Sequence, residues 1–425
     1  MITFLKISWR NVFRSLRRTI IIALVIAMGY TGMLFSWGMM NGFLNQSIDM
    51  LINSHLSHIQ IHEKGFNNNP VIKKNIKEHD KIYNLIKDNS NIKAIAKRVK
   101  SQGMINSTET SSGVMIIGID PDSEVKVSNI KDSLTEGKFI EKEDKNTIYL
   151  GKKLSEKLKA GIGDKVVLQA STINNEVGGA AYRIKGIFQT NSPEFDKAMV
   201  FITLKASQKL FEIKDYISEF AIILKKPKLL NETKTDIVSL LTLPSPLAGE
   251  GEKAVQPSHL TQYEVLTWQE IMPGITRTIE MSTKMIYIFL IIILIAISCS
   301  IINTLFVVIF ERFKELGIMK AIGTKPFQIF VLVLLESFWM CFIGLILGGI
   351  LSLITMGYFS NVGINLSAYS KGMSMIRLGS ILYPTVTFSQ AIDCVILTVI
   401  IVTIASIYPA IVAGRIKIVK ALKFV

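Results

Sequence analysis

Cysteine is scarce in this 425-residue chain, and its placement limits how the protein can be stabilised. The three cysteines are Cys299, Cys341 and Cys394, and each lies within a long apolar run. Residues 46–284 contain none, so this large segment must fold without disulfide bonds. It is long enough to build a hydrophobic core of its own. We expect the three thiols to serve as packing residues.

Charge is also missing from four long stretches. No charged residue occurs between Arg18 and Asp49, and each of the other three runs contains at most one. A membrane-spanning helix needs about 20 apolar residues. One such run would suit a buried soluble core, but four together predict transmembrane helices at 20–43, 285–310, 327–357 and 388–411. The first run is longer than the apolar core of a signal peptide and no cleavage motif follows it, so we interpret it as a retained anchor.

Motifs for enzymatic chemistry are absent from the sequence. There is no G-x-x-x-x-G-K-[ST] phosphate-binding loop, no H-E-x-x-H and no paired-cysteine motif. His55, His58 and His62 come nearest to a metal-ligand set, but only His58 and His62 would share a strand face, and no fourth ligand is suggested. We interpret the three histidines as surface residues of a strand. The sequence therefore predicts a non-catalytic chain that binds no cofactor or metal.

The net charge of +15 is concentrated beside the apolar runs. Residues 1–18 carry +5, residues 311–325 carry +2 and the tail after Ala413 carries +4. This is the positive-inside pattern, which predicts that both termini and the 311–325 loop are cytoplasmic and that residues 46–284 lie on the other side. A nucleic-acid-binding protein would gather its basic residues on one folded surface, so the pattern disfavours that function.

The external segment combines strand and helix patterns. Two β-α-β units are predicted, the first from 55–63, 77–88 and 92–99 and the second from 218–226, 231–241 and 263–268. Between them, residues 103–203 are rich in strand and turn signals. We therefore predict an α/β domain with a mostly β insertion, and an exposed Pro- and Gly-rich insertion at 243–257. The domains are expected at 1–45, 46–284 and 285–425.

A short charged segment, ERFKELGIMKAIG at 311–323, separates two apolar runs. Gly323 is expected to end a helix, and Pro326 to lie at the start of the next. The first half of the segment is charged, whereas the second half is mainly apolar and includes Leu316 and Ile318. A solvated connector does not need these apolar residues, and a helix lying on lipid would have a more distinct apolar face. The mixture favours docking into a groove on another protein.

Three motifs resemble the FtsX-like ABC transporter permeases, also called the MacB or type VII group. ERFKELGIMKAIGTKPFQI resembles the loop between their second and third membrane helices, and ISWRNVFRSLRRTIIIALVIAMG resembles their amphipathic entry helix and first span. Their C-terminal pattern is carried here by Tyr408, Pro409, Ala410, Ala413, Arg415, Val419, Ala421 and Leu422. Within this group, SHIQIHEKGF, IIGIDPDSE, GDKVVL, YRIKGIF and TWQEIMPGI are similar to the Lol lipoprotein-releasing permeases.

The resemblance implies an α-helical membrane protein with four transmembrane helices in a 1+3 arrangement and a large α/β domain. That domain would be a MacB-like periplasmic core domain with a β-rich insertion, on a protein of the bacterial inner membrane. A separate ABC ATPase subunit, which binds ATP and Mg²⁺, would dock on the coupling helix 311–323. The docking residues implied there are Phe313, Glu315, Leu316, Gly317, Ile318, Ala321 and Gly323.

Further partners follow from the same resemblance. A second permease chain, identical or homologous, would complete the complex, and a lipid-anchored cargo would leave the inner membrane when ATP hydrolysis moves the external domains. For the Lol relatives the cargo is a lipoprotein, and a periplasmic chaperone receives it. Their chaperone-binding hook would follow GDKVVL, where QASTINNEVGGAAY departs from the family pattern. Two alternatives remain open: MacB-like export of peptides or small molecules, and FtsX-like signalling to a cell-wall hydrolase.

Two pairs of glycines in the apolar runs are spaced for close helix packing. Gly38 and Gly42 form a G-x-x-x-G pattern, which permits close approach either at a lateral opening in the complex or within one chain. Gly344 and Gly348 repeat this spacing in the third run. We expect helix packing at both pairs.

Two acidic residues interrupt the apolar runs, where charge is costly. Glu336 lies about three turns into the third run, and we interpret it as a structural hydrogen-bonding residue. Asp393 lies near the external start of the fourth run and is expected to reach the interface. A proton-coupled role for Glu336 is disfavoured by the resemblance to ATP-driven transporters.

Overall fold

The computed structural model describes residues 2–14, 16–190, 192–242, 262–365 and 381–418. The chain divides into two compact units. Met1–Gln46 and Thr278–Val425 form one, which we call the helical unit, and Ser47–Arg277 form the other, which we call the α/β unit. The predicted insertion at 243–257 lies outside the described residues.

Within the described residues, four helices are long and apolar enough to cross a membrane. They are α2 (Leu16–Leu51), α10 (Pro273–Glu311), α12 (Pro326–Val362) and α13 (Phe388–Gly414). A continuous helix bonds its backbone N–H and C=O groups internally, as the apolar interior of a bilayer requires. Each of the four contains one predicted run, so the prediction of four such helices is confirmed.

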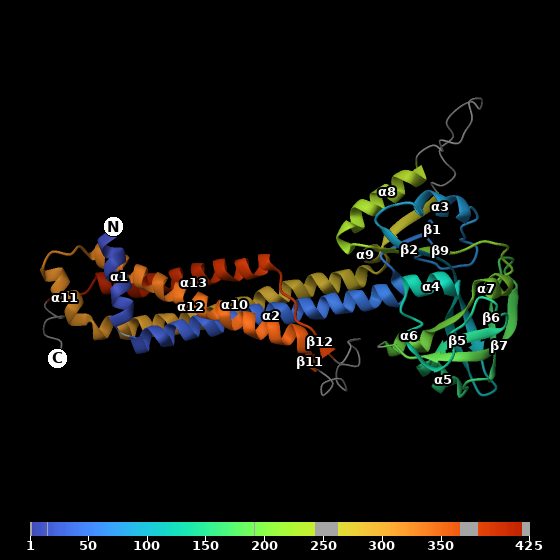
Figure 1. Ribbon diagram of the computed structural model, residues 1–425, viewed down its shortest axis with the longest axis horizontal. Coiled ribbons are helices and arrows are strands. Elements are labelled where there is room, and N and C mark those ends of the chain that lie inside the picture. Colours follow the sequence, from blue (N-terminus) through green and yellow to red (C-terminus); the bar gives the residue numbers. More distant parts are fainter. Residues whose placement is uncertain (1, 15, 191, 243–261, 366–380, 419–425) are drawn as a thin grey trace, which may run out of the picture. The chain divides into compact units, whose positions relative to one another are not determined.

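The four helices lie side by side within the helical unit (Figure 1) and share a hydrophobic core. Its buried side chains include Met33 of α2, Leu290 of α10, Met340 of α12 and Cys394 of α13. Val12 of the N-terminal helix packs in the same core. The remaining elements of this unit are α1 (Ile2–Arg14), α11 (Phe313–Ala321), β11 (Ile364–Asn365) and β12 (Ile381–Leu382).

The cysteines divide between buried and exposed positions. Cys341 and Cys394 are buried, as predicted for packing residues, whereas Cys299 is exposed on α10. The prediction is therefore wrong for Cys299. An apolar run shows that a residue lies in a membrane helix, but it does not show which side of the helix contacts the neighbouring helices.

One part of the α/β unit is a four-stranded antiparallel sheet with two helices beside it (Figure 1). The strand order is β10-β1-β9-β2, and every neighbouring pair is antiparallel. Two β-α-β units interleave to give this order, β1-α3-β2 and β9-α8-β10, as in split β-α-β folds. Both predicted units are thus present. The elements are β1 (Ile59–Glu63), α3 (His79–Ile86), β2 (Ile92–Asn106), β9 (Glu219–Leu224), α8 (Leu230–Thr242) and β10 (Tyr263–Thr267).

The other part is a small closed β-barrel. Strand pairing runs from β2 through β3, β8, β5, β7 and β6, and β6 pairs again with β2, which closes the ring. Closing a sheet on itself removes the edges that an open sheet exposes. Besides β2, the ring contains β3 (Ser111–Ile119), β5 (Thr147–Gly151), β6 (Lys165–Ser171), β7 (Val177–Phe188) and β8 (Met199–Thr203). Outside the ring, β4 (Leu134–Gly137) pairs with β7.

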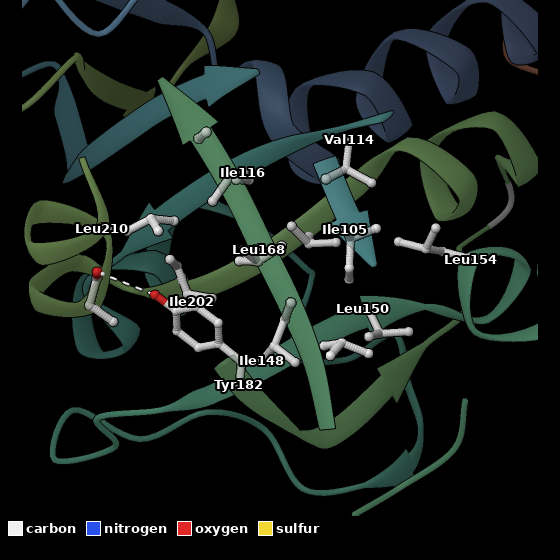
Figure 2. Packing of buried hydrophobic residues seen from close by; sticks show 14 of the residues in the cluster. Ile105, Val114, Ile116, Ile148, Leu150, Leu154, Leu168, Tyr182, Ile202 and Leu210 are labelled. Carbon is white, nitrogen blue, oxygen red and sulfur yellow. Dashed lines mark hydrogen bonds between the residues drawn. The ribbon is translucent and has the colours of Figure 1, made fainter. Parts of the chain in front are cut away.

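Alternate side chains of the barrel strands fill its interior (Figure 2). On β6, Val166, Leu168 and Ala170 are buried and alternate with exposed residues. Leu168 packs in one cluster with Ile105 of β2 and Ile202 of β8. This period-two pattern is the one expected of strands with one face on a core.

Strand β2 belongs to both parts of the α/β unit. Residues up to Arg98 pair with β9, and residues from Arg98 onward pair with β3. The predicted start of the β-rich insertion, residue 103, lies inside this strand, so the sheet and the barrel share a strand at that point. The short elements of the unit are η1 (Ile52–Leu56), α4 (Pro121–Val127), α5 (Lys152–Leu158), α6 (Pro193–Ala198), α7 (Leu204–Leu210), η2 (Pro227–Leu229) and α9 (Trp268–Ile271).

Candidate functional site

The charged segment between the second and third long helices forms α11. Arg312, with φ −97° and ψ 16°, separates it from α10. Gly323 follows its end with φ +103°, a backbone conformation that favours glycine. Pro326 then takes the first position of α12, where its missing N–H is harmless. The structure agrees with the predicted end and restart of the helix.

One side of α11 is buried within the helical unit. Leu316 is only 2% exposed and packs in a cluster with Val333 of α12 and Ala410 of α13. Gly317 is also buried. This corrects the expectation that Leu316 contacts a partner ATPase, because its apolar surface is already removed from water inside its own chain.

The other side of α11, with the loop after it, is apolar and exposed. Ile318 is 48% exposed, Ile322 82% and Phe327, at the start of α12, 71%. We call these three residues the α11 surface. Three exposed apolar side chains within ten residues of sequence are candidates for a surface that a partner covers. Among the predicted docking residues Ile318, Ala321 and Gly323 are exposed, and the prediction omitted Phe327.

An ion pair between the partly buried Arg312 and the buried Glu336 lies beside α11. Arg312 Nη1 donates to Glu336 Oε1 and Oε2 at 2.8 and 3.0 Å. Glu336 Oε1 also accepts from Asn11 Nδ2 of α1 at 2.6 Å. Arg312 Nε donates to Glu315 at 3.1 Å, and Arg14 of α1 pairs with the same carboxylate at 2.9 Å. These contacts agree with the interpretation of Glu336 as a structural hydrogen-bonding residue.

The described part of the C-terminal family motif, from Tyr408 to Arg415, lies at the end of α13, whereas Val419, Ala421 and Leu422 lie outside the described residues. Lys320 of α11 donates its Nζ to the carbonyl oxygen of Ile416, 2.8 Å away, so the segment that follows α13 is tied to α11 at Ile416. Tyr408 and Arg415 are exposed, and Pro409 and Ala410 are buried. The motif therefore contributes both to packing and to the surface of the helical unit.

Gly344 and Gly348 bring α12 against α2. A Cβ at Gly344 would lie 2.7 Å from Ile26 Cβ, and one at Gly348 would lie 3.0 Å from Ala27 Cα. Thr31 of α2 donates its hydroxyl to the Gly348 carbonyl at 3.2 Å. The helices thus meet through small residues, as membrane helices commonly do.

Gly38 and Gly42 also face parts of their own chain. A Cβ at Gly38 would lie 2.6 Å from Met356 Cε of α12, and one at Gly42 would overlap the carbonyl oxygen of Tyr383. We expected Gly38 and Gly42 to permit close approach either at a lateral opening or within one chain. The contacts in the structure are of the second kind, packing within one chain.

The segment in which the Lol resemblance implies a hook is a β-hairpin. Ser171 of β6 pairs with Val177 of β7, and the Thr172 N–H donates to the Glu176 carbonyl at 2.8 Å. The chain therefore reverses within residues 172–176. Val177 is 78% exposed beside this turn.

Two of the three histidines predicted on the strand surface are buried, and the third, His55, is half-buried in η1. His58 and His62 are 7% and 1% exposed, because β1 lies between β10 and β9 in the sheet. The prediction that they lie on the surface is wrong. Burial, together with nearby Lys93, lowers the pKa of His58 to about 4. Burial also lowers the pKa of His62 to about 4, although Glu219 opposes it, so both rings are neutral at pH 7.

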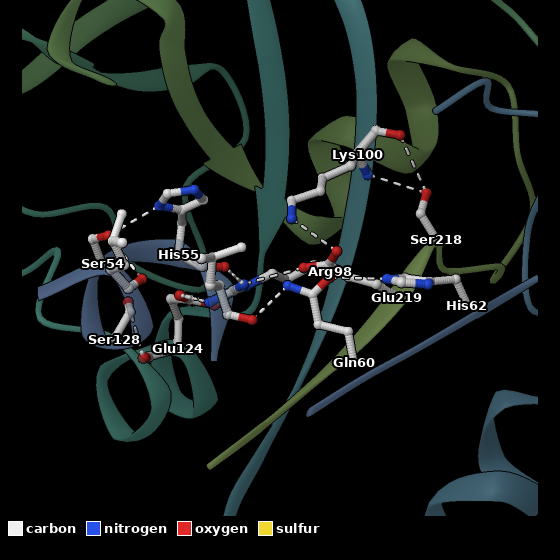
Figure 3. A network of polar contacts seen from close by, with 12 residues as sticks. Ser54, His55, Gln60, His62, Arg98, Lys100, Glu124, Ser128, Ser218 and Glu219 are labelled. Carbon is white, nitrogen blue, oxygen red and sulfur yellow. Dashed lines mark hydrogen bonds and ion pairs between the residues drawn. The ribbon is translucent and has the colours of Figure 1, made fainter. Parts of the chain in front are cut away.

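Arg98 is the centre of a buried polar network that sequence reasoning missed (Figure 3). Its guanidinium donates to both oxygens of Glu124 at 2.6 and 2.8 Å and to Glu219 at 3.1 Å. It also donates to the His55 carbonyl at 2.7 Å, which ties η1 to β2. Lys100 donates to the second oxygen of Glu219 at 2.8 Å. Burial disfavours the charge on Glu219, but Lys100 and Arg98 outweigh it and lower its pKa to about 2.

Three other side chains come close enough together to hold a metal ion: His79, Asp80 and Asp215. The Lys97 ammonium lies 2.9 Å from His79 Nδ1 and 2.7 Å from Asp80 Oδ1. Because this cation already pairs with two of the three groups, we assign no metal site here.

Two family matches cover both units of the chain. Residues 19–240 match the MacB-like periplasmic core domain, and residues 287–418 match the FtsX-like permease C-terminal domain. The chain belongs to the FtsX-like permeases with a MacB-like periplasmic core domain. It is an ABC transporter permease, the non-catalytic membrane component of such a transporter, and this role implies an ATPase partner.

Two lipoprotein-releasing system transmembrane proteins LolC are similar to the permease. The protein from Neisseria meningitidis serogroup B is 22% identical over 373 residues, which cover 85% of the permease and 81% of the relative. The protein from Buchnera aphidicola subsp. Schizaphis graminum is 24% identical over 364 residues, which cover 82% of each chain.

Two solved structures are also similar to part of the permease. The extracellular domain of the noncanonic ABC-type transporter YknZ from Gram-positive bacteria is 15% identical, with a TM-score of 0.34, over 50% of the permease and 100% of that domain. The periplasmic region of MacB from Actinobacillus actinomycetemcomitans is 12% identical, with a TM-score of 0.35, over 55% of the permease and 97% of that region.

Proposed function

We propose that the permease releases lipoproteins, or related lipid-anchored cargo, from the inner membrane. The observation that carries this proposal is similarity over more than four-fifths of the permease to two proteins named for lipoprotein release. The α/β unit and the four membrane helices supply the architecture that such a function needs, an external domain attached to a membrane-embedded bundle.

The energy would come from a separate ATPase subunit, which binds the ATP and Mg²⁺ and docks on the α11 surface. Exposed Ile318, Ile322 and Phe327 supply apolar anchors for that contact. Leu316 packs against α12 and α13, so a force applied to α11 reaches both helices. The permease itself would bind no nucleotide.

Movement would then pass along continuous helices. The helical unit ends at Gln46, but α2 continues to Leu51. The helical unit resumes at Thr278, but α10 already begins at Pro273, so both helices include residues of both units. A continuous helix transmits a displacement along its length because its backbone hydrogen bonds run unbroken. We infer that closure of the ATPase shifts the external domain and expels the cargo from the outer leaflet.

The orientation and the remaining partners belong to the same proposal. The basic segments favour cytoplasmic termini and a cytoplasmic α11, with the α/β unit in the periplasm. A second permease chain, identical or homologous, would complete the membrane part. A periplasmic chaperone would accept the cargo, and the exposed Val177 beside the β6–β7 turn is the apolar feature that favours a contact there.

Depletion of the permease is expected to leave lipoproteins in the inner membrane. Its expression would be placed under a titratable promoter in its own cells, and inner and outer membranes would be separated by density after depletion. Lipoproteins labelled on their acyl chains should accumulate in the inner-membrane fraction, because no other step of their synthesis is blocked.

Restoring the wild-type chain should return the lipoproteins to their normal membrane. An outer-membrane protein without a lipid anchor is the control, and its distribution should stay unchanged. An unchanged lipoprotein distribution in depleted cells would contradict the proposed cargo, and the export and signalling alternatives would then replace it.

A further inference from the structure

Arg312, at the bend between α10 and α11, pairs with the buried Glu336 of α12. We propose that Arg312 and Glu336 are positioning residues, which hold α11 at a fixed angle to α12 so that a docked partner moves the two helices together. The identity of that partner, an ATPase, rests on the proposed function. The fixed angle is a property of the permease alone and is measured without the partner.

Arg312 stands where the chain changes direction. Its backbone interrupts the helical path after Glu311, and its carbonyl accepts the Leu316 N–H at 3.0 Å, a hydrogen bond of the first turn of α11. The same residue therefore starts α11 through its backbone and binds α12 through its side chain. Because Arg312 Nε binds Glu315 of α11 and Arg312 Nη1 binds Glu336 of α12, rotation of α11 about this point must lengthen one of these two contacts.

Glu336 is an unusual residue for its surroundings. Its side chain is 4% exposed and lies among Leu316, Leu332 and Val333. A carboxylate at such a place is stable only when it is paired, here with Arg312. A well-packed apolar side chain of similar size would be as stable or more so, and stability alone therefore does not account for the pair. Charged hydrogen bonds are directional, and they can fix an orientation that apolar contacts leave open.

The guanidinium of Arg312 connects α11 and α12 because it presents separate edges. Nη1 faces Glu336 of α12, whereas Nε faces Glu315 of α11. Arg14 and Asn11 of α1 bind the same two carboxylates from the other side. A lysine at position 312 would offer one compact ammonium and could not reproduce both contacts. Position 312 therefore needs the two separate donor edges of arginine, which fix the orientation of α11. A positive charge alone would not fix it.

The test measures the distance between α11 and α12 in the full-length permease in lipid nanodiscs. Spin labels would be attached through Lys314→Cys on α11 and Ile346→Cys on α12, both exposed positions, in a Cys299→Ser background diluted with unlabelled chain. Pulsed electron paramagnetic resonance should give one narrow distance distribution. In Glu336→Gln the distribution should broaden by about twofold or more, because the guanidinium loses its carboxylate on α12 and keeps only Glu315 of α11. Arg312→Lys should give an intermediate width.

Asp393→Asn is the matched control, because it removes an acid from an exposed site in another membrane helix, and it should leave the distribution narrow. If Glu336→Gln fails to fold, the double variant Arg312→Met/Glu336→Met decides, because it removes both charges and leaves neither unpaired. A broad distribution in the folded double variant supports the positioning role, and a wild-type distribution in it or in Glu336→Gln overturns it. If no ATPase binds the wild-type permease although its distribution is narrow, that result would count against the proposed function and not against the positioning role.

Discussion

Buried charge gives single residues a large influence on this permease. Arg98 in the α/β unit and Arg312 in the helical unit each bind two carboxylates. Taking an ion pair out of water is unfavourable, and leaving one member unpaired is worse. Replacing one partner is therefore expected to disturb either site more than replacing both.

The buried histidines predict that the α/β unit loses stability in acid. Folded His58 and His62 have pKa values of about 4, below the ordinary value of 6.5. Between these values the unfolded chain binds more protons than the folded chain, so the free energy of unfolding falls as the pH falls. From pH 7 to pH 4.5 the loss should be roughly 2 kcal/mol for each histidine. Urea unfolding of residues 47–277, followed by circular dichroism, measures it.

A matched variant separates the histidines from the other titrating groups. In His58→Gln/His62→Gln both positions keep a polar side chain but do not take up a proton in this range. The variant should show a shallower dependence of unfolding free energy on pH than the wild-type unit. Equal slopes for the two proteins would mean that the histidines are not the source of the acid sensitivity.

Among the secondary-structure elements, α11 has two environments within nine residues. Successive helical residues are separated by about 100°, so Leu316 and Ile318 point to nearly opposite sides. Leu316 packs with α12 and α13, while Ile318 is exposed. The helix can therefore be held by its own unit and still offer an apolar surface to a partner.

The exposed side of α11 is expected to control ATPase docking. Ile318→Asn/Ile322→Asn should reduce recovery of a P-loop ATPase with the tagged permease by about tenfold or more, since buried interface anchors typically contribute above 1 kcal/mol each. Lys314→Ala, which removes an exposed charge, should change recovery little. Purification in mild detergent from matched expression levels, with quantification of the ATPase, measures both.

Leu316→Ala is the contrasting variant for this helix. It should lower the thermal stability of the permease, because it leaves a cavity in a core formed by its own chain. If Ile318→Asn/Ile322→Asn recovers the ATPase at wild-type levels, the ATPase does not dock on the α11 surface.

Local patterns predicted the elements well, because the signals lie inside each element. Gly323 and Pro326 mark the end of α11 and the start of α12, and the β-α-β units follow from alternating apolar residues. The barrel was not predicted, because its closure depends on pairing between distant residues such as Gly103 and Ala170. A single sequence carries no local signal for which strands will pair.

The same limit applies to the site. Charge inside an apolar run predicted that Glu336 makes polar contacts, but its partners Asn11 and Arg312 come from two other elements. The exposed and buried sides of α11 could not be distinguished from its mixed pattern, because α12 and α13 decide which side is covered. His58 and His62 were predicted on the surface because polar and apolar residues alternate along this strand. The strand is nevertheless covered on both faces, so its polar residues are buried as well.

At the scale of the whole molecule, the chain forms two compact units with different proposed roles. The helical unit contains the α11 surface and the Arg312–Glu336 pair, and the α/β unit has its own barrel core. In our account the ATPase acts on the first unit and the cargo leaves through movement of the second. Transport should therefore require the permease and the ATPase together.

The most direct test of this account is release of a lipoprotein from reconstituted vesicles. The permease, the ATPase that co-purifies with it and any second permease chain would be placed in liposomes with a fluorescent acylated lipoprotein, and a soluble periplasmic acceptor would be added. We predict release that requires hydrolysable ATP and is lost with Ile318→Asn/Ile322→Asn. Release at the same rate without ATP, or ATP hydrolysis by the intact complex with no release of any acylated lipoprotein, would contradict the account.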